Sequence, residues 1–509
     1  MTQTKGNCYF LPTAAAEALM TESVGRLTPV LIEDNVAEPF TALDCFDQSL
    51  RRSGRLLLAT RTRLSILTVD GGTLSQPSHR KGRFVATFRE GPVKDALSDL
   101  SPLRCLLPIE SGNLRQVVLG FVDSDHQIHC RAHLHILTGT GGQSAVLVTL
   151  QGLHGYGKSF ANLHRRVEAC GGGALDFESL YADIFPGLIG YKSKPKVVIK
   201  PKDTAFKAAN DIIDAYIPVA RANEVGIIAD YDTEFLHDYR IALRKIRSVL
   251  SLFKGVYAKG QTADLKLRFS EMMAPTGRLR DLDVHLLEKQ QYFDFLPTAL
   301  HDGLDRMFAM FAVQRKAEKA KLARHMRSRG YKNTITDLAN LFAKRKKLRP
   351  GPNADLAAHD FARALIWKRY RRICKIAAGI GPDTDESEVH DLRIHCKKLR
   401  YLMEFFAHLF PRPAFNFLIK PLKHLQDNLG RINDYAVQQI SLQDFLRRVS
   451  RNPDGESQNV GQSVGALILV LQQRQLEERA KVVERFARFN SPKTQATFRA
   501  LFHDRDAKK

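Results

Sequence analysis

Two stretches of the chain carry a histidine followed by three regularly spaced cations, a pattern suited to binding an extended anion. The first runs from His237 to Arg247 and the second from His390 to Arg400. In each stretch the cations follow the imidazole by three, seven and ten residues, which places all four groups on one side of an α-helix. Such a stripe presents positive charge along about 15 Å of helix, so that successive phosphates of a polyanion meet successive cations.

The two stripes belong to an internal duplication. Residues 237–247 and 390–400 are identical at six of eleven positions and are offset by 153 residues. A second pair of windows, 277–284 and 430–437, is identical at four of eight positions and has the same offset. Two separate windows that agree on one offset indicate two copies of a unit of about 150 residues.

An apolar seam runs beside each stripe and predicts which face of each helix is buried in a core. Apolar residues three and four positions apart mark the face of a helix that turns toward a core. The cations stand one position further along the chain, so they turn about 100° away from that face and stay available to a ligand. The seam residues are Leu236, Tyr239, Leu243, Ile246, Leu250 and Phe253 in the first copy, and Val389, Leu392, Cys396, Leu399 and Met403 in the second.

Helical spacing continues through the C-terminal part of the chain. Breaks at 344–352 and 452–462 interrupt it. So many amphipathic segments with almost no strand pattern predict helical bundles. The expected helices are 206–220, 233–257, 265–274, 283–292, 300–328, 355–378, 386–410, 415–429, 435–450 and 464–489.

The second motif of the repeat is predicted to organise helix ends. Gly277 and Gly430 fit the position that follows the last turn of a helix. Asp281 and Asp434 fit the position that caps the next helix. A carboxylate would repel a polyanion, so a structural role is favoured for both aspartates.

The interpretation as an anion site competes with a simpler one, in which the cations only face solvent. Long basic side chains often cover an apolar seam with their stems. A purely structural stripe usually has acidic partners one helical turn away, and few are present here. Because both copies keep the same arrangement of groups, the sequence favours binding.

The net charge of +23 is concentrated in the helical part of the chain. Residues 1–200 carry 22 basic and 18 acidic residues, whereas residues 201–509 carry 55 and 36. A positive field raises the local concentration of anions. Nucleic acid, an anionic membrane surface and polyphosphate are therefore all candidate partners.

Residues 1–190 are expected to form a separate domain, since 509 residues are too many for one core. The basic, proline-containing stretch 191–203 is predicted to link it to the helices. Strand patterns occur at 54–70, 83–89, 116–123, 128–137 and 144–150, and helical patterns at 13–20 and 159–169.

The sequence predicts a cytoplasmic protein that does not insert into membranes. Its seven cysteines are widely spaced and form no CxxC pattern, which indicates a reducing compartment and no zinc site. The N-terminus has no basic segment followed by a long apolar run, so no signal peptide is expected. The apolar run 466–471 is too short to cross a bilayer.

The pattern H-D-x-R-I-x-x-[RK]-K-[IL]-R followed by G-R-[LI]-x-D, occurring twice, resembles the CHAD family, the conserved histidine α-helical domain. The resemblance covers roughly residues 204–489. It implies two pseudo-symmetric four-helix bundles, 204–350 and 351–509, that bind inorganic polyphosphate without cofactor or catalysis, with polyphosphate granules as an expected location. The ligand groups that it implies are His237, Arg240, Arg244, Lys245, Arg247, His390, Arg393, Lys397, Lys398 and Arg400, with Arg278, Arg280, Arg431 and Lys423 as weaker candidates.

The N-terminal domain resembles a degraded CYTH domain, a β-barrel-like tunnel of α+β class that hydrolyses triphosphate with a divalent metal. Residues 46–58 are similar to that family's D-x-x-L…G…L-R-x-R region, and residues 148–158 to its late strand with L-R-G-Y-x-K. The first strand, 5–11, lacks the ExExK carboxylates, and 145–151 has none either. A hard cation then lacks oxygen ligands, so we expect the fold without the activity. Cations that could line such a tunnel, or face solvent, are Arg61, Arg63, Arg83 and Arg89.

Three other functions stay open at this point. Nucleic-acid binding fits the charge, although no zinc-finger, RRM, KH or bZIP signature is present and no aromatic residues interleave with the stripes. Some nonspecific nucleic-acid binding is expected in any case. An active CYTH-type triphosphatase would need the missing carboxylates. A metal site at His237 or His390 is disfavoured because neighbouring cations repel a metal ion.

Overall fold

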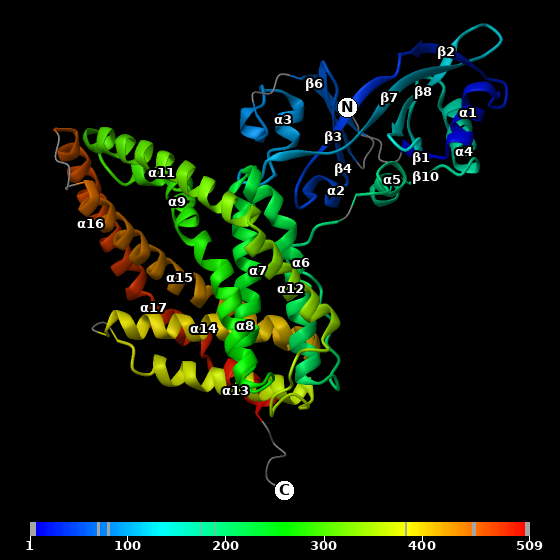
Figure 1. Ribbon diagram of the computed structural model, residues 1–509. Coiled ribbons are helices and arrows are strands. Elements are labelled where there is room, and N and C mark those ends of the chain that lie inside the picture. The colour runs from blue at the N-terminus through cyan, green and yellow to red at the C-terminus, as the bar shows by residue number, and fades with distance from the viewer. Residues whose placement is uncertain are drawn as a thin grey trace. The chain divides into compact units, whose positions relative to one another are not determined.

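The chain forms two compact units, Met1–Lys192 and Ser193–Lys509, which we call the sheet unit and the helical unit (Figure 1). The computed structural model describes residues 7–68, 72–78, 82–174, 176–188, 190–381, 384–449 and 455–503. Within these ranges no helix is both long and apolar enough to cross a membrane.

The sheet unit is built on one antiparallel sheet of ten strands. The strand order is β10-β1-β9-β8-β7-β3-β4-β5-β6, and β2 pairs with β7 beside this path. The strands are β1 Cys8–Leu11, β2 Thr28–Asp34, β3 Glu38–Cys45, β4 Arg55–Ala59, β5 Arg63–Thr68, β6 Thr73–Pro77, β7 Leu106–Val122, β8 Ile128–Gly139, β9 Ser144–Gly152 and β10 Gly173–Ala174.

Alternation along the long strands explains how this sheet buries one face. Successive side chains of a strand point to opposite faces, and every second residue of β8 around Leu134 is buried in a core with Leu163 of α4 (Gly157–Ala169) and with α1 (Thr13–Thr21). A second core joins the sheet to α5 (Phe177–Ile184). No pairing joins β10 to β6 in the described part of the chain, so the tunnel that the CYTH resemblance implies stays a prediction.

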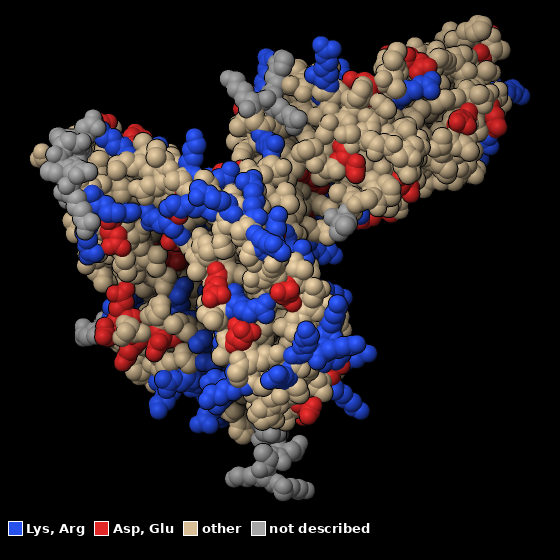
Figure 2. All heavy atoms as spheres, in the orientation of Figure 1, with Lys and Arg blue, Asp and Glu red and all other residues tan. Residues whose placement is uncertain are grey.

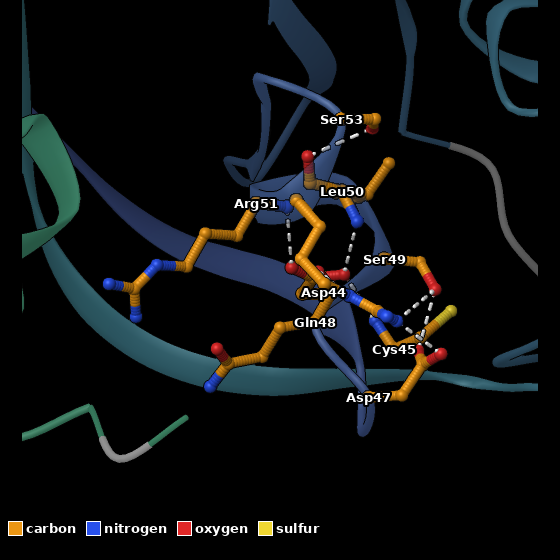
Figure 3. Close-up of polar contacts among 9 residues, drawn as sticks. Asp44, Cys45, Asp47, Gln48, Ser49, Leu50, Arg51 and Ser53 are labelled. Atoms are coloured by element: carbon orange, nitrogen blue, oxygen red, sulfur yellow. Dashed lines mark hydrogen bonds and ion pairs between the residues drawn. The ribbon is translucent and has the colours of Figure 1, made fainter. Parts of the chain in front are cut away.

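A buried carboxylate organises the turn after β3, within the region that resembles the CYTH pattern (Figure 3). Asp44 has no exposed surface. Its carboxylate accepts hydrogen bonds from the backbone N–H groups of Cys45, Leu50 and Arg51 at 2.7, 2.9 and 3.0 Å. These bonds satisfy donors around the first turn of the short helix α2 (Ser49–Arg52). Burial outweighs the hydrogen bonds and raises the pKa of Asp44 to about 6.

Two strand predictions for this unit are wrong. Residues 54–70 form the hairpin of β4 and β5 instead of one strand, because the chain reverses where the backbone N–H of Thr60 bonds the carbonyl of Arg63 at 2.9 Å; Asp70 lies outside the described residues. Residues 83–89 contain a 3₁₀ turn, Val85–Thr87. The hydroxyl of Thr87 donates to the carbonyl of Phe84 at 2.6 Å, a local bond that competes with strand pairing.

The charged residues that the sequence singled out in this unit lie at the surface. Asp47, the acid of the CYTH-like pattern, forms an ion pair of 2.6 Å with Arg52. Among the described residues, no three His, Cys, Asp or Glu side chains are grouped so as to hold a metal ion. The four arginines that could line a tunnel or face solvent are exposed, namely Arg61, Arg63, Arg83 and Arg89.

The helical unit consists of two halves in which the helices follow one another in a similar order. Its first half consists of α6 Ala205–Ala229, α7 Thr233–Leu252, α8 Lys259–Met273, α9 Gly277–Leu287, α10 Lys289–Asp294, α11 His301–Arg327 and α12 Arg329–Lys344. Its second half consists of α13 Ala358–Ala377, α14 Glu386–Phe406, α15 Arg412–Val449, α16 Gly455–Ala480, α17 Val482–Phe489 and α18 Pro492–Phe502. Helices α13, α14, α15, α16 and α17 begin 153 or 154 residues after α6, α7, α8, α11 and α12. The duplication therefore includes five pairs of helices, whereas in the described part of the chain no helix begins at the positions that correspond to the starts of α9, α10 and α18.

Helix α15 is continuous where the first half has the two helices α8 and α9. The separate helices predicted on either side of Gly430, and the helix end predicted there, are wrong. Gly277 is the first residue of α9 and directly follows the 3₁₀ turn Ala274–Thr276, so the chain continues as a helix there. Neither glycine has a positive φ. Asp281 and Asp434 lie inside α9 and α15, so neither caps a helix.

The two repeats share a core. The seams predicted on α7 and α14 are confirmed, since all their residues are buried. A further core joins α9, α10 and α11 to α15 and α16, in the arm at the left of Figure 1. There the rings of Phe311 and Phe445 lie 5.0 Å apart. A Cβ added to Gly303 of α11 would stand 2.5 Å from the backbone oxygen of Asn459 of α16, so these two helices are in close contact.

We expect Phe311→Ala to lower the free energy of unfolding of the helical unit by about 3–5 kcal/mol, because a buried aromatic ring is lost from a core that both repeats build. Urea unfolding followed by the helical circular dichroism signal should show one transition at a lower midpoint. Met310→Ala on the same helix is the control, since Met310 is 39% exposed. Two transitions, of which only one moves, would show that the repeats fold separately.

Candidate anion-binding groove

The stripes of α7 and α14 face a common pocket. It has a volume of about 260 Å³, and its walls include Arg244 and Arg247 of α7 with Arg393, Lys397 and Lys398 of α14. The buried seams of both helices fix the direction in which these stripes point. Cations that are remote in the sequence therefore converge on one space.

A second pocket, of about 440 Å³, continues the basic surface along α7. His237, Arg240 and Arg244 line it together with Arg280 of α9 and Ser441 of α15. Arg244 lines both pockets, so they adjoin, and we call the two together the basic groove. Figure 2 shows Lys and Arg side chains gathered in bands over the helical unit.

Equivalent residues of the two repeats meet in this groove. Arg244 and Lys397, offset by 153 residues, line the same pocket, as do Ser248 and Tyr401. The second pocket is lined by four further pairs with this offset, namely Arg280 and Asn433, Asp281 and Asp434, Val284 and Val437, and His285 and Gln438. The groove therefore lies where the two halves of the duplication come together.

Burial and mutual repulsion disfavour the charged forms of the groove's cations. Burial, Arg244 and Arg393 together lower the pKa of Lys397 to about 8. Burial, followed by the charge of Arg244, also lowers the pKa of Arg240. Burial lowers that of Arg393, where Asp434 opposes it and Arg244 reinforces it. An anion placed among these groups would offset the repulsion and favour their charged forms.

Two guanidinium groups of the groove have buried donors without a partner. Nε of Arg244 and Nη1 of Arg280 are buried and form no hydrogen bond to any residue that the structure describes. Buried polar groups in proteins are nearly always hydrogen-bonded. Phosphate oxygens are acceptors of the kind that these donors lack.

Two carboxylates make the groove uneven in charge. Asp281 and Asp434 line the second pocket, and burial raises the pKa of both against the lowering effect of nearby arginines. Among the described residues that line the first pocket there is no carboxylate. The positive charge is therefore least compensated between α7 and α14.

Comparison with known proteins places these elements in a family. Residues 211–443 match the family model described as CHAD domain, and this segment includes both stripes and both copies of the second motif. The helical unit contains a CHAD domain.

Two solved structures resemble parts of the chain. The crystal structure of the CHAD domain from the plant Ricinus communis has 24% sequence identity and a TM-score of 0.48, and the match covers 62% of this chain and 98% of that one. PptA from Streptomyces chartreusis has 15% identity and a TM-score of 0.41, with 58% and 99% covered. No curated protein matches the chain.

Two of the predicted ligands in this CHAD domain are engaged by protein partners, which link α7 to α14 for Lys245 and α14 to α15 for Arg400. Lys245 is 8% exposed. Its ammonium forms an ion pair with Glu404 and lies 4.1 Å from the ring centroid of Tyr401. Arg400 donates from Nε to Glu404 Oε1 at 2.6 Å and from Nη1 to Gln426 at 3.1 Å. Both residues act in the packing of the domain.

Other predicted ligands lie outside the groove. Arg278 donates from Nη2 to Gln314 at 2.7 Å. Arg431 forms an ion pair of 3.0 Å with Glu478 of α16. Two further predicted ligands are exposed and line neither pocket, namely His390 and Lys423. The groove brings together His237, Arg240, Arg244, Arg247, Arg280, Arg393, Lys397 and Lys398.

The sequence did not predict that His285 and Ser441 line the second pocket. The ring nitrogens of His285 lie 3.0 Å from the hydroxyl of Ser441 and 3.0 Å from that of Tyr292. Burial, with the charge of Arg278, lowers the pKa of His285 to about 4, so this ring is neutral at pH 7. The offset of 153 would have paired His285 with Gln438, but nothing in the sequence relates either to Ser441.

We expect Glu404→Gln to lower the free energy of unfolding of the CHAD domain by about 1–3 kcal/mol, because the buried ammonium of Lys245 loses its carboxylate. Burial opposes ionisation of Glu404, but Lys245 and Arg400 outweigh it and lower its pKa. The contribution of the pair is therefore present above the ordinary pKa of glutamate and is lost as the pH falls through the lowered value.

Urea unfolding at a series of pH values tests this prediction. The difference between wild type and variant should shrink on acidification. Glu388→Gln, at an exposed position of the same helix, is the control and should unfold like wild type. A difference that does not change with pH would contradict the ion-pair explanation.

Proposed function

We propose that the basic groove binds inorganic polyphosphate. The observation that carries the proposal is the convergence of the α7 and α14 stripes on one pocket, lined by five cations and by no carboxylate of the described residues. Crowded cations with depressed pKa values and unpartnered N–H donors gain most from a ligand that brings many oxygens and a high negative charge.

The shape of the groove favours a linear chain of phosphates over a nucleic-acid duplex. The two pockets adjoin at Arg244 and have volumes of about 260 and 440 Å³. A thin chain with a charge on every phosphate can enter both. A duplex carries its phosphates on a wide cylinder and could reach only the cations at the rim. Nucleic-acid binding is therefore the second candidate, expected to be weaker and less dependent on the buried cations.

The sheet unit is proposed to have no metal-dependent triphosphatase activity. The support is its lack, among described residues, of a cluster of three His, Cys, Asp or Glu side chains able to hold a metal, together with the carboxylate-free strand β9. We also propose that polyphosphate binding directs the protein to polyphosphate granules in the cytoplasm.

Replacing Arg240, Arg244 and Arg247 with Gln should weaken binding of long-chain polyphosphate by at least about tenfold, since each side chain offers charge-assisted hydrogen bonds. Replacing Arg393, Lys397 and Lys398 with Gln should have a similar effect. The matched control replaces three exposed cations outside the groove with Gln, which removes the same net charge: Arg324, Arg327 and Arg329.

Binding is measured by titration at one salt concentration, in competition with DNA at equal phosphate concentration, with circular dichroism as the folding control. Wild type should prefer polyphosphate to DNA. The control variant, with Arg324, Arg327 and Arg329 replaced, should bind polyphosphate nearly as well as wild type. Equal losses in all three variants would mean that only net charge matters. DNA binding as tight as polyphosphate binding would favour the nucleic-acid function.

The depressed pKa of Lys397 gives the proposed site a pH dependence. A bound polyanion favours the charged ammonium and raises this pKa, so binding takes up a proton near pH 8, and affinity falls as the pH rises through that value. Lys397→Arg keeps the charge at all these pH values and should flatten the profile between pH about 7 and 9. Calorimetric titration across this range checks it, and an unchanged profile in the variant would exclude Lys397 as the titrating group.

A further inference from the structure

Another pocket of the CHAD domain has a different chemistry from the basic groove. It has a volume of about 590 Å³ and shares no lining residue with the two pockets of the groove. Helix α13 supplies one wall, and α18 with the turn before it supplies the other. We call it the aromatic pocket, lined by Trp367, Tyr370, Arg371, Cys374, Asn490, Gln495, Arg499 and His503.

The wall of this pocket offers a flat apolar surface on a rigid support. Tyr370 stacks on Phe498 with ring centroids 3.9 Å apart, and Phe498 is fully buried, which fixes this part of the wall in the core. The indole of Trp367 stands beside Tyr370 and is partly exposed. Exposed indole surface in a pocket is a good stacking surface for a planar heterocycle.

Two guanidinium groups stand at this pocket. Arg371 and Arg499 are exposed, and in the described part of the chain neither forms an ion pair, whereas the neighbouring Arg488 pairs with Glu484. No carboxylate is among the described residues that line the pocket. A planar donor fork of this kind binds phosphate oxygens in pairs.

Two amide side chains are held so that one offers a donor and the other an acceptor. Oδ1 of Asn490 accepts from the hydroxyl of Tyr370 at 2.6 Å and from Cys374 Sγ at 3.6 Å, which leaves its amide nitrogen to donate. Gln495 donates from Nε2 to the backbone oxygen of Asn490 at 2.9 Å, which leaves Oε1 to accept. The backbone carbonyl of Asn490 fixes the orientation of Gln495, and Asn490 offers its amide nitrogen in the arrangement in which Tyr370 donates to it.

A donor beside an acceptor complements the edge of a base that carries an amino group next to a ring nitrogen. Adenine and cytosine have this arrangement, because an amino group donates and the adjacent ring nitrogen accepts, whereas the corresponding edge of guanine presents the reverse order. Adenine is favoured of the two because its larger ring offers more surface for stacking on Trp367. A site built for one pattern rejects the other, because its polar groups would be left unpaired.

We propose that the aromatic pocket binds an adenine nucleotide. The base stacks against Trp367, its amino edge meets Gln495 and Asn490, and the phosphates extend to Arg371 and Arg499. The volume of the pocket lies in the range of small-molecule sites. This site is independent of polyphosphate binding in the groove.

The experiment uses the full-length protein, because Trp367 is its only tryptophan and reports directly on the pocket. Titration with metal-free ATP should give a saturable change in tryptophan fluorescence, and GTP should bind at least about tenfold more weakly. Arg371→Gln with Arg499→Gln should weaken ATP by at least about tenfold. Gln495→Leu should reduce the preference for ATP over GTP.

The variant with Arg240, Arg244 and Arg247 replaced by Gln is the control that separates the two sites. It should bind long-chain polyphosphate at least about tenfold more weakly and keep the full ATP titration. Equilibrium dialysis with labelled ATP gives an independent measure of the same affinity, and circular dichroism confirms folding of each variant.

Four results would overturn the proposal. The first is no saturable ATP signal at millimolar concentrations in folded wild type. The second is ATP binding that the groove variant abolishes or the Arg371 and Arg499 replacements leave unchanged. The third is inorganic tripolyphosphate binding at this pocket as tightly as ATP, and the fourth is equal affinity for ATP and GTP.

Discussion

The CHAD domain must hold two rows of like charge at close range, and the rest of its structure follows from that constraint. Arg244, Arg393 and Lys397 repel one another across the first pocket, and burial together with this repulsion lowers the pKa of Lys397. The buried seams of α7 and α14 resist this repulsion. The ion pair of Lys245 with Glu404 ties the two helices directly. One carboxylate thus neutralises a cation that faces inward, while no carboxylate of the described residues lines the first pocket. Such an arrangement stores unfavourable electrostatic energy that an anionic ligand releases, which is the physical basis for the proposed function.

The sequence predicted the parts of this arrangement that depend on periodicity. Apolar residues spaced by three and four located α7 and α14 with their buried faces, because burial of such a face decides helix position. The offset of 153 residues between the two stripes recurs, within one residue, at five pairs of helix starts in the unit. Lys245 directly follows Arg244 in the sequence, so spacing alone did not distinguish it clearly from the stripe residues. It could not show that Lys245 points to Glu404, because that partner lies 159 residues away in the chain.

The features that the sequence did not predict depend on contacts between distant elements. Gly430 has the residue type of a helix end, yet α15 continues through it, since local preference is overruled where packing on both sides favours a helix. The convergence of both stripes on one pocket, the pairing of α11 with α16 and the place of Ser441 in the groove all arise from how the two repeats cross. In the sheet unit, Asp44 gave no sign of its buried role, because its partners are backbone N–H groups, which every sequence contains.

The most direct test of the account is the number of sites for a short chain. Tripolyphosphate, titrated calorimetrically into the full-length protein, should bind to the basic groove as one molecule per chain. Replacing either the α7 stripe or the α14 stripe should remove that single site, because residues of both line the same pocket. Two equal sites per chain, each lost with one stripe and unaffected by replacement of the other, would contradict the claim that the stripes form one groove.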